Sequence, residues 1–217
     1  ELDHIPGDKD YNLKVWDAIN EIAGMIRETD PNHPVMTVVG YGKLEKIKDI
    51  KERCPNLDLL GVNAYAALLN VPEWLREYGW EKPFVVTEWG PSGWWEVPRT
   101  KQGVVIEETG TEKARIYRER YEKVIMADPR CLGSYVFLWT TNRQERTHTW
   151  FNMFHDSLKT ETVEVMQYMW TGKWPANRAP RIAYPAINGL GPLESIEVAP
   201  SSINTATVEA SDPDNDG

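Results

Sequence analysis

Cysteine is scarce in this sequence, in which Cys54 and Cys131 are the only two among 217 residues. Two thiols cannot build the dense disulfide framework of a small secreted domain, and their spacing does not match the C-x-x-C pair of a metal site. We therefore expect ordinary thiols at core or helix-end positions, with a single bridge between them as the alternative. Long apolar runs are also missing, because no stretch approaches the roughly 18 apolar residues of a membrane-spanning helix.

Positive charge is in deficit as well. Lys and Arg number 24 against 33 Asp and Glu, which gives a formal net charge of −9 and leaves no basic stripe. Nucleic acid, whose phosphates need clustered positive side chains, is therefore not an expected partner. The sequence also lacks H-E-x-x-H, the P-loop, G-x-G-x-x-G and G-x-S-x-G. These absences argue against a metalloprotease, a nucleotide hydrolase, a dinucleotide-dependent enzyme and an esterase, and no cofactor or catalytic metal is expected.

Tryptophan is abundant, with ten residues in an otherwise polar chain. Several lie among glycines, prolines and charged residues rather than in apolar runs: Trp89, Trp94, Trp95, Trp139 and Trp150. Exposed indole rings beside a cleft suit stacking against the apolar faces of sugars, whereas burial in the core is the ordinary alternative.

Helical and strand-like segments alternate along most of the chain. Helical spacing of apolar residues, or a capping or proline signal, marks five segments: 11–29, 44–53, 72–78, 109–127 and 160–170. Short apolar runs of strand length lie between them, at 35–39, 57–63, 83–87 and 132–139. This alternation predicts βα units on a parallel sheet rather than a sandwich or a helical bundle.

The composition changes near residue 174, where prolines begin to interrupt a stretch without helical signals. We expect a linker over 175–188, followed over 189–217 by the truncated start of an all-β, Ig-like module. The tail carries aspartates at alternate positions before a glycine, namely Asp212, Asp214 and Asp216. This pattern opens a calcium loop but lacks the closing glutamate, and an acidic hairpin turn is the alternative.

Polar and aromatic residues gather where the predicted strands end, which is where parallel βα proteins place their chemistry. Glu88 follows the strand over 83–87, and Asn63-Ala64-Tyr65 ends the strand before it. Trp139 ends the strand after it, and Glu1 occupies the first such position in the chain. Two carboxylates thus stand among aromatic residues.

The segment Phe84-Val-Val-Thr-Glu88-Trp-Gly resembles the strand-7 nucleophile motif of the clan A (β/α)8-barrel retaining glycoside hydrolases. Asn63-Ala-Tyr65 is similar to the strand-6 motif of the same clan, and Trp139 to the strand-8 tryptophan that floors the reactive sugar site. Glu1 takes the place of the strand-4 acid/base by position, since the asparagine that precedes it in the clan motif is not in the sequence. The matches occur in the order that the clan requires, and family 2 and β-glucanase-like barrels are the most similar types.

The resemblance implies the C-terminal half of a (β/α)8 TIM barrel over 1–174 and an enzyme that hydrolyses β-linked oligo- or polysaccharides. Glu88 is then the nucleophile and Glu1 the acid/base, with carboxyl groups about 5 to 5.5 Å apart as in retaining enzymes, and Tyr65 orients Glu88. The expected sugar contacts, several of them in the long loop after Glu88, are His4, Asn63, Trp89, Trp94, Trp95 and Trp139. An extracellular or periplasmic location follows from the same resemblance and from the module-like tail.

Two other functions are alternatives to hydrolysis: one uses the same residues, and the other uses only the aromatic ones. A glucan transglycosylase would employ the same two carboxylates and pass the sugar to another sugar instead of to water. A non-catalytic carbohydrate-binding protein on a decayed barrel would keep the tryptophans and lose one carboxylate. Glutamates at both strand ends argue against this last alternative.

Overall fold

The computed structural model describes residues 12–40, 46–140 and 146–215, so that Glu1, His4 and Asp216 lie outside the described residues. The chain divides into two compact units. The first comprises residues 1–89 and 122–136, and the second comprises residues 90–121 and 137–217.

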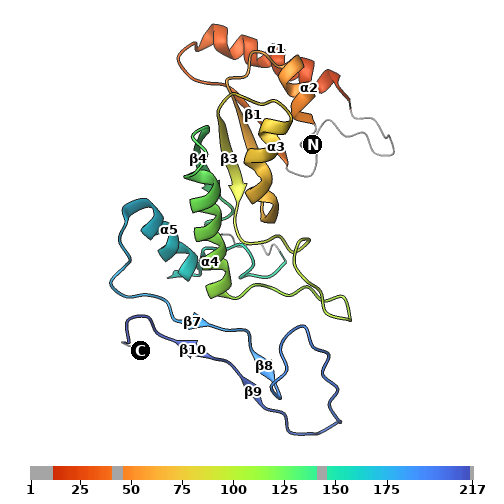
Figure 1. The fold of residues 1–217 in the computed structure, drawn as a ribbon, viewed down its shortest axis with the longest axis vertical. Helices are drawn as coiled ribbons and strands as arrows, with labels where there is room; N and C mark the ends of the chain where they lie inside the picture. The colour runs from red at the N-terminus through yellow and green to blue at the C-terminus, as the bar shows by residue number, and fades with distance from the viewer. Residues whose placement is uncertain (1–11, 41–45, 141–145, 216–217) are drawn as a thin grey trace. The chain divides into compact units, whose positions relative to one another are not determined.

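The first unit is a parallel α/β arrangement (Figure 1). Its strands are β1 (Met36–Gly40), β2 (Leu59–Asn63), β3 (Phe84–Trp89) and β4 (Cys131–Val136). Its helices are α1 (Lys14–Thr29), α2 (Lys46–Arg53) and α3 (Val71–Glu77), with a 3-10 turn, η2 (Ala66–Asn70), before α3. Neighbouring strands pair in chain order and run parallel. The predicted alternation of strands and helices on a parallel sheet is confirmed, although β4 ends earlier than expected.

One face of this sheet is packed into the core. Strand and helix residues that have no exposed surface include Leu60, Val62, Phe84, Val86, Ile47, Ile50 and Leu75. Successive residues of a strand point to opposite faces, so the pairs Leu60 and Val62 of β2 and Phe84 and Val86 of β3, at alternate positions, lie on one face of the sheet. Burial of this apolar area is the main source of stability for the unit.

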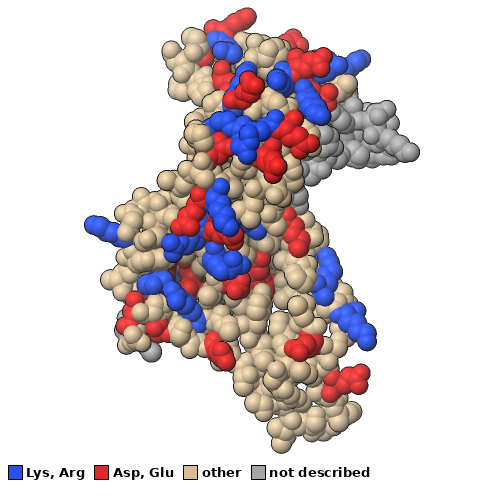
Figure 2. Space-filling model, in the orientation of Figure 1, with Lys and Arg blue, Asp and Glu red and all other residues tan. Residues whose placement is uncertain are grey.

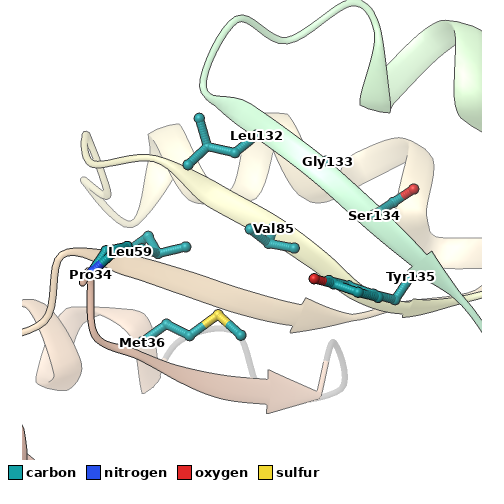
Figure 3. A pocket seen from close by; sticks show the side chains of 8 residues that line it. All are labelled: Pro34, Met36, Leu59, Val85, Leu132, Gly133, Ser134 and Tyr135. Atoms are coloured by element: carbon teal, nitrogen blue, oxygen red, sulfur yellow. The ribbon is translucent and has the colours of Figure 1, made fainter. Parts of the chain in front are cut away.

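The other face keeps apolar side chains exposed. Met36 and Val38 of β1 expose 41% and 44% of their surface, and Leu132 and Tyr135 of β4 expose 63% and 67%. Met36, Leu132 and Tyr135 line a hollow of about 570 Å³ on this face (Figure 3). Gly61 in β2 has no room for a side chain, because a Cβ there would lie 2.8 Å from the Val38 side chain.

The two cysteines are free thiols. Cys54 is buried and its Sγ donates to the Trp16 carbonyl at 3.1 Å, while Cys131 Sγ donates to the Gly133 carbonyl at 3.6 Å. The expectation of ordinary thiols is confirmed, and the alternative of a bridge between them is wrong.

Cys54 should resist thiol reagents in the folded protein. Burial raises the pKa of this thiol to about 11, so at pH 8 only about one molecule in a thousand carries the reactive thiolate. With Ellman's reagent at pH 8, we expect no reaction of Cys54 over minutes and full reaction after denaturation in guanidinium. Rapid labelling of the Cys54 peptide in the native protein would contradict this burial.

The second unit contains two longer helices, α4 (Gly110–Arg120) and α5 (Glu161–Thr171), which pack against each other. The predicted start of α4 is confirmed, since the Thr109 hydroxyl accepts from the Glu112 backbone N–H at 3.1 Å and caps the helix. A π-helical turn, η3 (Tyr121–Ile125), follows α4 in the chain. Two short antiparallel strands, β5 (Phe154–His155) and β6 (Leu158–Lys159), precede α5.

The stretch that follows α5 is anchored to that helix. Trp174 stacks on Tyr168 with ring centroids 4.4 Å apart, and the Arg178 guanidinium lies 4.0 Å from the Trp174 ring centroid. The Ala179 N–H donates to Glu164 Oε1 at 2.8 Å. Beyond it, β7 (Arg181–Ile182) pairs antiparallel with β10 (Ala210–Ser211), and β8 (Ala186–Ile187) with β9 (Ala206–Thr207). The division into a linker and an Ig-like module stays a prediction.

The acidic tail makes a hydrogen-bonded turn. Asp212 Oδ1 accepts from the backbone N–H groups of Asp214 and Asn215 at 2.7 and 3.1 Å, and Asp214 Oδ2 accepts from the Arg178 N–H at 2.6 Å. Within residues 12–40, 46–140 and 146–215, no group of three His, Cys, Asp or Glu side chains is placed to hold a metal ion. Calcium at Asp212, Asp214 and Asp216 stays a prediction.

Acidic and basic side chains are interspersed over the face shown in Figure 2, without a continuous basic stripe. None of the helices in the described part of the chain is long and apolar enough to cross a bilayer.

Candidate active site

A bulge in β3 sets the position of the Glu88 side chain. Val62 of β2 is the partner of Val86, but the next residue of β2, Asn63, is the partner of Glu88, so that Thr87 is the extra residue on β3. A bulge of this kind re-aims the side chain that follows it. The bulge therefore brings Glu88 and Asn63 to the same level at the carboxyl ends of their strands.

Both oxygens of the Glu88 carboxylate accept hydrogen bonds. Asn63 Nδ2 donates to Oε2 at 2.8 Å, and the Tyr65 hydroxyl donates to Oε1 at 2.5 Å. The Thr87 hydroxyl donates to Asn63 Oδ1 at 2.7 Å, which fixes the amide so that its N–H group faces Glu88. The Ala64 N–H donates to the Glu88 carbonyl at 2.9 Å and ties down the backbone as well.

This arrangement gives a fixed and partly accessible carboxylate. Tyr65 is 4% exposed, so its hydroxyl has little freedom, while Glu88 itself is only half-buried. A carboxylate with these properties at a parallel strand end can act as a nucleophile towards an electrophilic carbon.

The other predicted catalytic residue, Glu1, and the predicted sugar contact His4 lie outside the described residues. The expected separation between the Glu1 and Glu88 carboxyl groups therefore stays a prediction. Tyr65 and Asn63 both donate to Glu88; the sequence motif indicated this contact for Tyr65 only, and the predicted contact of Asn63 with a sugar stays a prediction.

Three of the predicted sugar contacts lie in the second unit. Trp139 exposes 55% of its surface and packs on Phe154 with centroids 4.7 Å apart. Trp95 is 45% exposed, and Trp94 meets it edge-on at 5.4 Å. These rings present aromatic surface to solvent, as stacking against a sugar requires.

Two of the tryptophans singled out in the sequence are buried instead. Trp89 has no exposed surface, and Trp150 is 2% exposed and donates its indole N–H to the Ser92 carbonyl at 3.0 Å. Both rings belong to the core, and neither is a surface that a sugar reaches.

A buried ion pair ties the two long loops of the second unit together. Lys113 of α4 is 7% exposed, and its Nζ donates to Glu107 Oε1 at 2.6 Å and to the Thr149 carbonyl at 2.7 Å. The Thr147 and Thr149 hydroxyls each donate to Glu107 at 2.7 Å. Burial acts to raise the pKa of Glu107, but Lys113 and the two hydroxyls lower it below its ordinary value. Burial lowers the pKa of Lys113, and Glu107 offsets only part of that change.

Gly90 allows the same two loops to touch. A Cβ at this position would lie 2.6 Å from the Phe137 carbonyl oxygen, closer than real Cβ contacts allow. Glycine is therefore required where the loop after β3 passes the start of the loop after β4.

Sequence analysis did not identify Arg120, a buried cation that reaches the loop after β3. A signal for it does exist. Buried residues recur through α4 at Lys113, Ile116, Tyr117 and Arg120, so that two basic residues fall on the apolar side of the helix. A charge at such a position must find a partner inside the protein.

Comparison with known proteins gives matches in structure only. No family model matches the chain, and no curated protein matches it in sequence. A Bacteroides uniformis β-glucuronidase superposes with a TM-score of 0.57 and 11% identity over 92% of this chain and 31% of that structure. An exo-β-agarase superposes with a TM-score of 0.51 and 16% identity over 73% of this chain and 23% of that structure. A Ruminococcus gnavus β-glucuronidase superposes with a TM-score of 0.51 and 15% identity over 73% of this chain and 29% of that structure.

These structures are glycoside hydrolases. Identities of this size establish a shared fold, so the chain has a glycoside hydrolase fold over the matched part. The chain spans less than a third of the length of each of the three.

Proposed function

We propose that this chain belongs to a retaining β-glycosidase, in which it forms the C-terminal half of the (β/α)8 barrel and supplies Glu88 as the nucleophile. The observation that carries the proposal is the Glu88 carboxylate, which stands at the carboxyl end of a parallel strand with both oxygens hydrogen-bonded by Asn63 and Tyr65. Parallel βα enzymes place their reacting groups at this end of the sheet.

The chemistry follows from the two donors. An ionised Glu88 attacks the anomeric carbon and forms a glycosyl ester, while an acid on the other side of the sugar protonates the leaving oxygen. As charge leaves Glu88 during attack, the Tyr65 and Asn63 donors keep the attacking oxygen aligned. Water then hydrolyses the ester with the help of the same acid residue acting as a base, a role that we assign to Glu1 by its position in the sequence.

Structural neighbours support this reaction class. The three comparison structures are named as β-glucuronidases and an exo-β-agarase, and the Bacteroides uniformis enzyme was solved covalently bound to cyclophellitol-6-carboxylate aziridine. A covalent adduct with a sugar mimic is what an enzymatic nucleophile produces. A β-linked glycan is accordingly the proposed substrate, and an extracellular or periplasmic location is proposed with it.

Covalent labelling tests the proposal directly. The complete protein is incubated with cyclophellitol aziridines of gluco, galacto and glucurono configuration, digested, and mapped by mass spectrometry. We expect one of them to label the peptide that contains Glu88, and Glu88→Gln to abolish the label. Turnover of a β-glycoside without any label at Glu88, or a first product of inverted configuration by NMR, would refute the retaining mechanism with Glu88 as nucleophile.

A further inference from the structure

The turn that follows β3 in the chain is held by a buried arginine. Arg120 of α4 is 5% exposed, and its Nη1 donates to the Gly90 carbonyl at 2.6 Å. Its Nη2 donates to the Ser92 hydroxyl at 3.1 Å. The planar guanidinium thus binds two points of the turn at once, which a single ammonium group cannot do.

Two carboxylates also bind backbone N–H groups of this turn. Glu108 Oε2 accepts from the Ser92 N–H at 3.0 Å, and Glu96 Oε2 accepts from the Gly93 N–H at 2.8 Å. Burial lowers the pKa of Arg120, and the charges of Glu108 and Glu96 act against that change. The cation and the two anions therefore compensate one another around the turn, which is the condition for keeping such groups out of water.

The turn held by these contacts supports the indole ring of Trp95. A Cβ at Gly93 would lie 2.5 Å from two carbons of the Trp95 indole, so the ring rests directly on the Gly93 backbone. Trp94 packs edge-on against the same ring at 5.4 Å, and Phe151 lies at 6.4 Å. With its neighbours in place, Trp95 still exposes 45% of its surface.

An exposed indole held on a rigid base suits a pyranose ring. The C–H groups on one face of a β-linked sugar form an apolar surface, and an aromatic ring binds it best when little conformational freedom is lost on contact. We infer that Trp95 is a preformed stacking platform for a β-linked sugar and that Arg120 is its positioning residue. The sugar class rests on the proposed function, whereas the support of Trp95 by Arg120 does not depend on Glu88.

Calorimetric binding on the complete protein tests the inference. The Glu88→Gln background keeps the ligands intact, and the probes are cellotetraose, laminaritetraose and neoagarotetraose. Trp95→Ala should weaken binding of at least one probe by about tenfold, and Arg120→Ala should weaken the same probe by a similar factor. Arg120→Lys should lose about threefold, because one of the two hydrogen bonds remains. Arg115→Ala on the exposed side of α4 is the matched control and should change nothing.

The double variant separates positioning from general stability. If Arg120 acts through the platform, Arg120→Ala combined with Trp95→Ala should bind no more weakly than Trp95→Ala alone. Additive losses in the double variant would overturn the role of Arg120. An unchanged affinity of a folded Arg120→Ala would overturn it as well.

Gly93→Ala gives a second route if Arg120→Ala does not fold. The added Cβ displaces the Trp95 ring without removing a buried charge, so affinity should fall about tenfold at an unchanged melting temperature. Full affinity in Gly93→Ala or in Trp95→Ala, or no binding of any probe in the Glu88→Gln background, would overturn the platform. If the predicted losses of affinity are observed but Glu88 is not labelled by the aziridines, the sugar-binding role of Trp95 stands and only the proposed role of Glu88 as nucleophile is refuted.

Discussion

Glu88→Gln should lower kcat on a β-glycoside substrate by at least about three orders of magnitude and change KM by less than about tenfold. Glutamine preserves the shape of the side chain and its contact with Tyr65, but its amide oxygen is a poor nucleophile. Binding of the substrate, which does not require attack, is then largely kept. Steady-state kinetics of the complete enzyme with an aryl β-glycoside measure both parameters.

Glu88→Ala in the presence of azide provides the positive test. The smaller side chain leaves room for azide to attack the anomeric carbon from the same side, so the product should be a glycosyl azide of inverted configuration. Glu73→Gln, on the exposed surface of α3, is a matched control that should retain full activity. A Glu88 variant that turns over substrate at the wild-type rate is incompatible with a nucleophilic role.

Glu107→Ala should reduce the free energy of unfolding by about 3 kcal/mol at pH 7, because it leaves the buried Lys113 ammonium without a carboxylate partner. Chemical denaturation followed by fluorescence measures the loss. Lys113→Met in the Glu107→Ala background should recover part of it, since no unpaired charge is then buried. Glu119→Ala, which removes a partner of the exposed Arg115, should stay within about 0.5 kcal/mol of the wild type.

The same pair predicts a pH dependence. The pKa of Glu107 is lowered from its ordinary value of 4.5 in the folded protein, so its contribution to stability is present above 4.5 and is lost as the pH falls through the lowered value. The stability difference between the wild type and Glu107→Ala should therefore narrow in strongly acidic solution. A difference that stays constant from pH 7 to pH 3 would show that the carboxylate charge is not the stabilising element.

Much of the first unit could be predicted because each strand is a short apolar run between polar segments. The run that ends before Glu88 also predicted this carboxylate at a strand end, and the Asn63-x-Tyr65 motif predicted the contact of Tyr65 with it, but not the second hydrogen bond from Asn63. The bulge at Thr87 could not be predicted, because the residue types along β3 do not reveal that the strand has one residue more than its partner β2 at this point.

Which tryptophans are buried could not be predicted from the sequence either. Trp95 and Trp150 both lie among polar neighbours, yet one is 45% exposed and the other 2%. The difference arises from contacts between loops far apart in the chain, such as the one from Trp150 to the Ser92 carbonyl. Local composition carries no information on such contacts, and the role of Arg120 depends on them too.

The close approach at Gly90 limits how the specificity of such an enzyme can change. New substrate preferences commonly arise when loops at the strand ends gain or lose residues. Here the loop after β3 and the loop after β4 share a boundary that leaves no room for a single added carbon. A side chain at position 90 would have to be matched by a shift of the loop after β4, so a library that randomises both loops and keeps Gly90 should yield more folded variants than one that randomises position 90 as well.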